Sequence, residues 1–150
     1  LRESMNSLQN AKFAIINGEK SQVFEDKINK ISKNIDIFYS KYTPINIKEL
    51  ENKKLLAFAG IGNPENFFDL LRDYDLNLKK TIKYPDHYNY SKEDLQRLVE
   101  LANEENSELV TTEKDYFRIK KFEFNEIKYL KVNLEILDKE NLINKVLSYL

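Results

Sequence analysis

The feature that most constrains the fold is an alternation of short apolar segments and helix-like segments that starts near Lys53. Residues 55–59 are Leu-Leu-Ala-Phe-Ala, an apolar run bounded by the turn residues Gly60-Ile61-Gly62. Asn63-Pro64 follows, and this pair suits the first positions of a helix. Because strands that alternate with helices are joined by crossovers, the sequence predicts an α/β fold with a mostly parallel sheet flanked by helices.

The other elements of this region are predicted from periodicity and caps. Strands are expected over 76–84, 108–111 and 127–136, and helices over 63–74, 91–102 and from Asp138 to the end. Ser91 with Asp94 forms a variant of the capping box, and Thr112 with Asp115 repeats that arrangement. The apolar residues of the last helix are expected to face inward: Leu142, Val146, Leu147 and Leu150.

The first 52 residues have a different character. They predict a helix over 1–11, a strand over 13–16, a helix over 23–31 and an extended connector over 35–47. Pro44 restricts that connector to an edge or an irregular strand. We therefore divide the chain into a middle or linker segment, residues 1–52, and a carboxyl-terminal α/β lobe, residues 53–150.

Composition excludes several classes of function. The 24 basic and 25 acidic side chains nearly cancel and form no separate block, which gives no electrostatic footprint for nucleic acid. The absence of cysteine excludes disulfides, zinc–thiolate sites and thiol catalysis. With only three glycines, no phosphate loop of the form G-x-x-x-x-G-K-[ST] is present. The apolar runs are also too short for a transmembrane segment, and the amino end does not resemble a signal peptide.

The stretch from Tyr84 to Tyr90 concentrates the residues that could do chemistry. It contains Asp86 and His87, the latter being the only histidine of the chain. It follows the predicted strand 76–84, and open α/β sheets place their ligand crevices at the carboxyl ends of strands. Histidine exchanges protons near neutrality, and a nearby carboxylate can fix its tautomer. His87 and Asp86 are therefore catalytic candidates.

The residues alone leave alternatives open. Asp86 could simply bond the backbone of its turn, and His87 could be one ring of an aromatic cluster. A metal site at His87 lacks a second histidine or cysteine, and a serine hydrolase would need a Gly-x-Ser-x-Gly elbow that the sequence does not contain. Gly60-Ile61-Gly62 is either an anion site or a tight strand-to-helix turn, and the second interpretation is favoured.

Three motifs in the same order and at similar spacing carry a family resemblance. Residues 56–68 are LAFAGIGNPENFF, residues 84–88 are YPDHY and residues 109–115 are LVTTEKD. Together they resemble the tetraacyldisaccharide 4'-kinase family of lipid A biosynthesis. Residues 1–3 and 14–18 are also similar to the family's middle section, except that Ser4 stands where the family usually has proline. The resemblance covers essentially the whole chain.

This resemblance implies the Rossmann-like second lobe of a two-lobed P-loop kinase. The family carries its phosphate loop and magnesium-binding acids in an amino-terminal domain that this sequence lacks. The opening residue, Leu1 rather than Met, agrees with a fragment. The implied reaction transfers the γ-phosphate of ATP, with Mg²⁺, to the 4'-hydroxyl of a tetraacyldisaccharide 1-phosphate, an acylated glucosamine disaccharide lipid. We expect the fragment alone to be inactive and not to bind Mg-ATP.

The resemblance also implies roles for individual residues. His87 matches a histidine that pairs with the base, an aspartate of the first lobe, and Asp86 is expected to orient the imidazole. Arg2 and Glu3 match residues on the nucleotide and metal side of the cleft. Seen without the first lobe, His87 is expected to face solvent and to have little to bond.

The resemblance implies that the full-length protein is cytoplasmic and peripheral at the inner membrane. A hypothesis of another class is a non-catalytic α/β binding or interaction module whose aromatic loop docks a partner. A phosphate loop encoded upstream of Leu1 would favour the kinase over this module.

Overall fold

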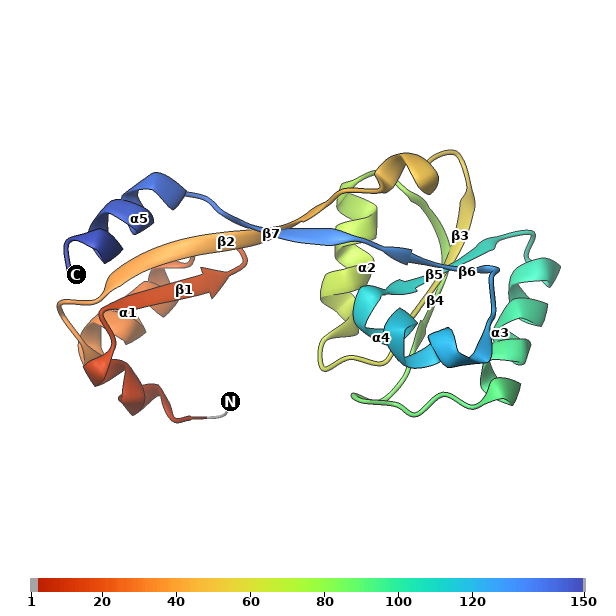
Figure 1. Ribbon diagram of the computed structural model, residues 1–150, viewed down its shortest axis with the longest axis horizontal. Coiled ribbons are helices and arrows are strands. Elements are labelled where there is room, and N and C mark those ends of the chain that lie inside the picture. Colours follow the sequence, from red (N-terminus) through yellow and green to blue (C-terminus); the bar gives the residue numbers. More distant parts are fainter. Residues whose placement is uncertain (1–2, 150) are drawn as a thin grey trace. The chain divides into compact units, whose positions relative to one another are not determined.

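The computed structural model describes residues 3–149, which fall into two compact units. One unit comprises the described residues up to Thr43 and those from Asn133 onward, and the other is Pro44–Val132. Figure 1 shows the helices and strands of each unit. Every helix in the described part of the chain is too short or too polar to cross a bilayer.

The unit Pro44–Val132 is built on a parallel four-stranded sheet in the order β4-β3-β5-β6 (Figure 1). Its strands are β3 (Lys54–Ala59), β4 (Asn77–Lys83), β5 (Glu108–Thr112) and β6 (Ile127–Leu130). The chain goes from β3 outward to β4, then crosses back to β5 on the other side of β3. The strand order therefore reverses between β3 and β5, which makes a topological switch point. The predicted α/β fold with a mostly parallel sheet is confirmed.

Helices cover both faces of this sheet (Figure 1). They are α2 (Pro64–Asp73), α3 (Lys92–Glu104) and α4 (Glu113–Ile119), with short 3₁₀ turns at η2 (Ile47–Glu49) and η3 (Lys120–Phe122). Alternate residues of β3 point to opposite faces: Ala57 packs in the cluster that contains α2, whereas Phe58 packs in the cluster that contains α3. Since β3 is covered on both faces, its sequence is a continuous apolar run rather than an alternating one.

The other unit contains a three-stranded sheet in the order β1-β2-β7. Its elements are η1 (Met5–Asn10), β1 (Phe13–Asn17), α1 (Gln22–Ile31), β2 (Asp36–Pro44), β7 (Val132–Ile136) and α5 (Lys139–Leu147). β1 and β2 are parallel. Of the two alternatives predicted for the Pro44 segment, the edge strand is wrong, because β2 is the central strand. Pro44 is the last residue of the strand, so its missing N–H removes a ladder hydrogen bond only at the end of β2.

The predicted single strand over 127–136 is in fact two strands in two sheets, β6 and β7. Between them, Lys131 donates its backbone N–H to Oδ1 of Asn46 at 2.8 Å. Nδ2 of Asn46 donates to the carbonyl of Tyr129 at 3.0 Å, and Ile45 N–H donates to the carbonyl of Lys131 at 3.0 Å. The Asn46 side chain thus bonds the backbone groups of Tyr129 and Lys131 at the point where the chain passes from the sheet of β6 to the sheet of β7.

The compact units do not coincide with the boundary predicted between residues 52 and 53. The difference arises because β7 joins the sheet of β1 and β2, so the end of the chain returns to the unit that contains its beginning. The inward orientation predicted for α5 is wrong at Val146 and Leu147, which are 40% and 59% exposed, and Leu150 lies outside the described residues. The division into a middle or linker segment and a carboxyl-terminal lobe stays a prediction.

Candidate functional site

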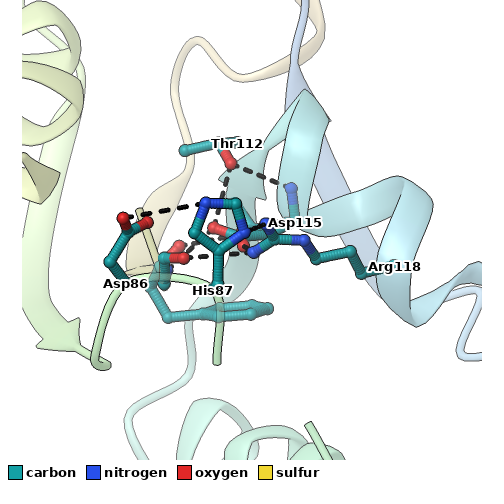
Figure 2. A network of polar contacts seen from close by, with 8 residues as sticks. Asp86, His87, Thr112, Asp115 and Arg118 are labelled. Atoms are coloured by element: carbon teal, nitrogen blue, oxygen red, sulfur yellow. Dashed lines mark hydrogen bonds and ion pairs between the residues drawn. The ribbon is translucent and has the colours of Figure 1, made fainter. Parts of the chain in front are cut away.

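The candidate site lies on three loops at the carboxyl ends of neighbouring parallel strands. Gly60 follows β3, the stretch Tyr84–Tyr90 follows β4, and Thr112 leads from β5 into α4. The carboxyl ends of parallel strands lie at one edge of a sheet, so the topology brings these loops together. Figure 2 shows the polar contacts that join them.

Asp115 is the buried anchor of this network. It is completely buried, and its Oδ2 accepts hydrogen bonds from Gly60 N–H at 2.8 Å and from the Thr112 hydroxyl at 3.0 Å. Its Oδ1 accepts from Nη1 of Arg118 at 3.1 Å. A buried carboxylate is costly unless it is paired and hydrogen-bonded. These three donors satisfy it and tie the β3 loop to α4.

Thr112 and Asp115 also start α4, as the sequence predicts. The Thr112 hydroxyl accepts the backbone N–H of Asp115 at 3.1 Å. Such caps satisfy amides that have no partner inside the helix. The cap therefore fixes the first turn of α4, which carries Arg118 one turn further on the same face.

Arg118 connects this anchor to His87 (Figure 2). Its Nη1 donates to Asp115 Oδ1 and to the Gly60 carbonyl, the latter at 3.2 Å. Its Nη2 lies 2.7 Å from Nδ1 of His87. A guanidinium has only donors, so Nδ1 of His87 is the acceptor and the neutral ring carries its proton on Nε2.

His87 itself is held by its backbone and presents its ring to solvent. Its N–H donates to the Gly60 carbonyl at 3.0 Å, and its φ of 60° is in the left-handed region, where histidine is found more often than most residues. The side chain is 68% exposed. The ring therefore faces solvent, as expected, but the expectation that it has little to bond is wrong because Arg118 occupies Nδ1.

Asp86 lies on the opposite side of the ring from Arg118 (Figure 2). Its Oδ2 is 3.7 Å from Nε2 of His87, a distance at which charges attract but which exceeds a hydrogen bond. In the described chain it is thus Arg118, not Asp86, that bonds the imidazole. The same carboxylate lies 3.5 Å from where a side chain at Gly62 would begin. A negative group at this turn agrees with the tight-turn interpretation rather than with an anion site.

Three tyrosines give the His87 loop a rigid base. The ring centroids of Tyr84, Tyr88 and Tyr90 lie 4.6 to 5.1 Å apart, and Tyr90 also packs edge-on against Phe58 of β3 at 5.6 Å. Burial, together with the negative charge of Asp115, raises the pKa of the Tyr90 hydroxyl, which therefore stays protonated. Its aromatic surroundings support the structural interpretation for the tyrosines rather than a catalytic one.

Gly60 is where backbone, tyrosines and polar network meet. A Cβ at this position would lie 2.8 Å from the Tyr90 hydroxyl and 3.1 Å from Cβ of Tyr88. Only glycine lets the backbone approach this closely while its N–H bonds Asp115 and its carbonyl bonds both His87 and Arg118.

The loop ends in the predicted capping box of α3, which the structure confirms. The Ser91 N–H donates to Asp94 Oδ2 at 2.9 Å, the Asp94 N–H donates to the Ser91 hydroxyl at 3.1 Å, and the Tyr88 hydroxyl also donates to Asp94 at 3.2 Å. The bond from Ser91 N–H is the main reason that the pKa of Asp94 is lowered. Both ends of the His87 loop are therefore fixed.

The predictions for Arg2 and Glu3 stay predictions. Arg2 lies outside the described residues, and the exposed Glu3 belongs to the other compact unit. Within residues 3–149, no group of three or more histidine, cysteine, aspartate or glutamate side chains could hold a metal ion.

Arg118 and Gly60 were not among the predicted site residues. A signal existed for both: Gly60 is in the first of the three motifs, and Arg118 stands three residues after the last one, which ends at Asp115. Their contact with His87 arises only when the three loops meet at one sheet edge. Sequence spacing alone does not reveal it.

The family model for tetraacyldisaccharide-1-P 4'-kinase (LpxK) matches residues 1–150. The tetraacyldisaccharide 4'-kinase of Pelagibacter ubique (strain HTCC1062) is 38% identical over 151 residues, covering 99% of this chain and 48% of that protein, in its carboxyl-terminal portion. The tetraacyldisaccharide 4'-kinase of Rickettsia akari (strain Hartford) is 44% identical over 96 residues, or 64% of this chain and 29% of that protein. This chain therefore spans less than half the length of these relatives.

A solved structure has a similar fold. It is described as the "apo" form of LpxK from Aquifex aeolicus in complex with ATP, and it superimposes with a TM-score of 0.59 at 20% sequence identity. The match covers 99% of this chain and 45% of that one. The family model matches the whole length of this chain, and the relatives and the α/β fold indicate the same family. The chain therefore belongs to the tetraacyldisaccharide 4'-kinase family.

Proposed function

We propose that this chain is the carboxyl-terminal part of an ATP-dependent lipid kinase. The whole protein would transfer the γ-phosphate of ATP to the 4'-hydroxyl of a tetraacyldisaccharide 1-phosphate in lipid A biosynthesis. The observation that carries this proposal is the family match over residues 1–150, on a chain whose family motifs converge at one sheet edge around an exposed histidine. ATP and Mg²⁺ are the proposed cofactors, held mainly by the amino-terminal domain of the whole protein.

His87 is the proposed contribution of this chain to the chemistry. Phosphoryl transfer depends on positioning, on charge stabilisation and on a group that orients or deprotonates the attacking hydroxyl. With its proton on Nε2, His87 can donate a hydrogen bond from its exposed side to the carboxylate of an aspartate in the amino-terminal lobe. That bond would hold the aspartate, the proposed base, toward the 4'-hydroxyl.

Asp86 has a secondary role in this proposal. Its carboxylate lies 3.7 Å from Nε2 of His87 and so places negative charge on the side of the ring that carries the proton. Arg2 and Glu3 are proposed to face the nucleotide. No metal-binding step is assigned to this chain, because its described residues contain no cluster of metal-ligating side chains.

The proposed partners are the acylated glucosamine disaccharide lipid and the protein's own amino-terminal lobe. The proposed location of the whole enzyme is cytoplasmic and peripheral at the inner membrane, where it could reach a lipid substrate. The isolated chain of 150 residues is proposed to be inactive, since it contains no phosphate loop. Calorimetry of this chain with Mg-ATP should therefore show no binding, and tight binding would contradict the proposal.

The direct test is an assay of the full-length protein with ATP, Mg²⁺ and tetraacyldisaccharide 1-phosphate. The product should carry one additional phosphate, at the 4' position, and its formation should require ATP. A full-length protein that folds but transfers no phosphate to this lipid would contradict the kinase proposal. It would favour the alternative of a non-catalytic binding or interaction module.

A further inference from the structure

We propose that Arg118 is a positioning residue that holds His87 as its Nε2–H tautomer, with Asp115 as its buried anchor. The effect of Arg118 on catalysis rests on the proposed function. Its structural part, the tautomer of His87, is independent of that function and can be measured separately.

The guanidinium of Arg118 is fixed at three points. Nη1 donates to Asp115 Oδ1 at 3.1 Å and to the Gly60 carbonyl at 3.2 Å, and Nη2 lies 2.7 Å from Nδ1 of His87. Its side chain is only 26% exposed, while that of Asp115 is completely buried. Hydrogen bonds between charged groups and their partners are stronger than neutral ones, particularly away from water. The geometry therefore restrains Arg118 before any substrate binds.

This restraint determines which ring nitrogen of His87 carries the proton. A neutral imidazole exchanges between two tautomers, and the hydrogen bond at one nitrogen selects the proton position at the other. Arg118 can only donate, so it excludes a proton from Nδ1. The exposed Nε2–H then becomes a donor, which is the form required to bond a carboxylate on the solvent side.

The charged groups around the ring favour the same tautomer. Arg118 is the positive group at Nδ1, and Asp86 is the negative group 3.7 Å from Nε2. Asp115 bonds Arg118 and does not bond His87 itself, and its carboxylate accepts hydrogen bonds from Gly60, Thr112 and Arg118. Asp115 therefore acts on His87 through Arg118 rather than by direct contact.

The position of the ring is set together with its tautomer. The Gly60 carbonyl accepts hydrogen bonds from the His87 N–H and from Nη1 of Arg118. The same oxygen therefore holds the backbone of His87 directly and its ring through Arg118. A lysine at position 118 would supply one compact ammonium in place of a planar fork and could not bridge Asp115, Gly60 and His87 in this geometry. Arg118→Lys is thus predicted to behave as a loss of function.

Nuclear magnetic resonance of this chain tests the structural part. Because His87 is the only histidine, labelling with ¹⁵N-histidine gives one pair of ring signals. At a pH where the ring is neutral, the wild type should show an unprotonated Nδ1 and a protonated Nε2. Arg118→Met should shift Nδ1 and give the mixed tautomers of a free imidazole, while Arg72→Met, which removes an exposed arginine of α2, should leave both signals unchanged. Identical ring signals in wild type and Arg118→Met would overturn the proposal.

Kinetics of the full-length protein test the catalytic part. Arg118→Met should lower kcat by about 10- to 100-fold, by analogy with the range for groups that orient metal ligands, while KM for ATP changes by no more than about 2-fold. Arg118→Lys should not restore kcat, and Arg72→Met should match wild type. If the wild type is active and folded Arg118→Met is equally active, the positioning role is wrong. If the wild type itself is inactive, the proposed function fails and the ring signals alone decide the tautomer.

Discussion

Nη2 of Arg118 lies 2.7 Å from Nδ1 of His87, although the two residues are 31 positions apart in the sequence. The contact joins the loop after β4 to the helix after β5, and both are tied to Gly60 after β3. Three loops at one sheet edge thus form one polar network around a histidine that faces solvent (Figure 2).

Gly60→Ala should destabilise the unit Pro44–Val132. The added methyl group would lie 2.8 Å from the Tyr90 hydroxyl, so the tyrosine or the backbone must move. Overpacking of this kind costs about 1–3 kcal/mol in the free energy of unfolding, which urea denaturation would measure. Gly62→Ala is the matched control, because a Cβ there has ordinary contacts of 3.5 Å and more. Equal stability of both variants would show that Gly60 is not constrained by close approach.

Asp115→Asn should destabilise the unit Pro44–Val132. The neutral amide leaves a partly buried guanidinium without its counter-charge and replaces one of the acceptor oxygens with a donor. Breaking a buried pair in this way costs about 3–5 kcal/mol, and the partial exposure of Arg118 places the expectation at the lower end. Denaturant midpoints of Asp115→Asn and the wild type measure this loss. A midpoint of Asp115→Asn equal to that of the wild type would contradict the anchor role.

Stability should fall on the acid side because of the capping box at Ser91. The bond from Ser91 N–H lowers the pKa of Asp94, so this carboxylate stabilises the fold above its unfolded pKa. That contribution is lost as the pH falls from about 4 through the lower folded pKa. Glu93 titrates in the same sense, its pKa being lowered by backbone and Ser91 hydrogen bonds. Unfolding of Asp94→Asn should depend less on pH between about 5 and 2 than that of the wild type, and parallel curves would exclude the carboxylate as a cause.

Asn46→Ala should weaken the point where the chain leaves β6. The substitution removes the bonds to the Tyr129 carbonyl and to the Lys131 N–H, which lie at 3.0 and 2.8 Å. Leaving such groups unpaired costs about 1–3 kcal/mol when they are buried. Hydrogen exchange at the Lys131 amide should become faster, whereas the exposed Asn103→Ala should have no effect there. Unchanged protection of Lys131 would contradict the bridging role of Asn46.

Local sequence signals predicted the parts of the fold that are decided locally. The run Leu55–Ala59 is apolar throughout because it forms a central strand that is buried on both faces. The Ser91–Asp94 capping box forms as expected. Periodicity could not reveal that residues 127–136 serve two sheets, because the alternation of side chains continues through Lys131. The break depends on Asn46, which is 85 residues away in sequence.

The candidate site was predictable to the same extent. His87 and Asp86 stand out as the only histidine and its neighbouring acid, and both lie at the predicted sheet edge. The identity of the residue that bonds the imidazole was not predictable. Adjacency in sequence favoured Asp86, but Nδ1 of His87 is bonded by Arg118 of α4.

The most direct measurement for the central claim is kcat of the full-length protein for 4'-phosphorylation with His87→Ala. Loss of the hydrogen bond to the base should lower kcat by about 100-fold or more, in the range of general acid–base catalysis. Lys121→Ala, on the exposed 3₁₀ turn η3, provides the control and should retain wild-type kcat. A folded His87→Ala enzyme that turns over within a few-fold of wild type would contradict the account, because His87 would then have no part in the reaction.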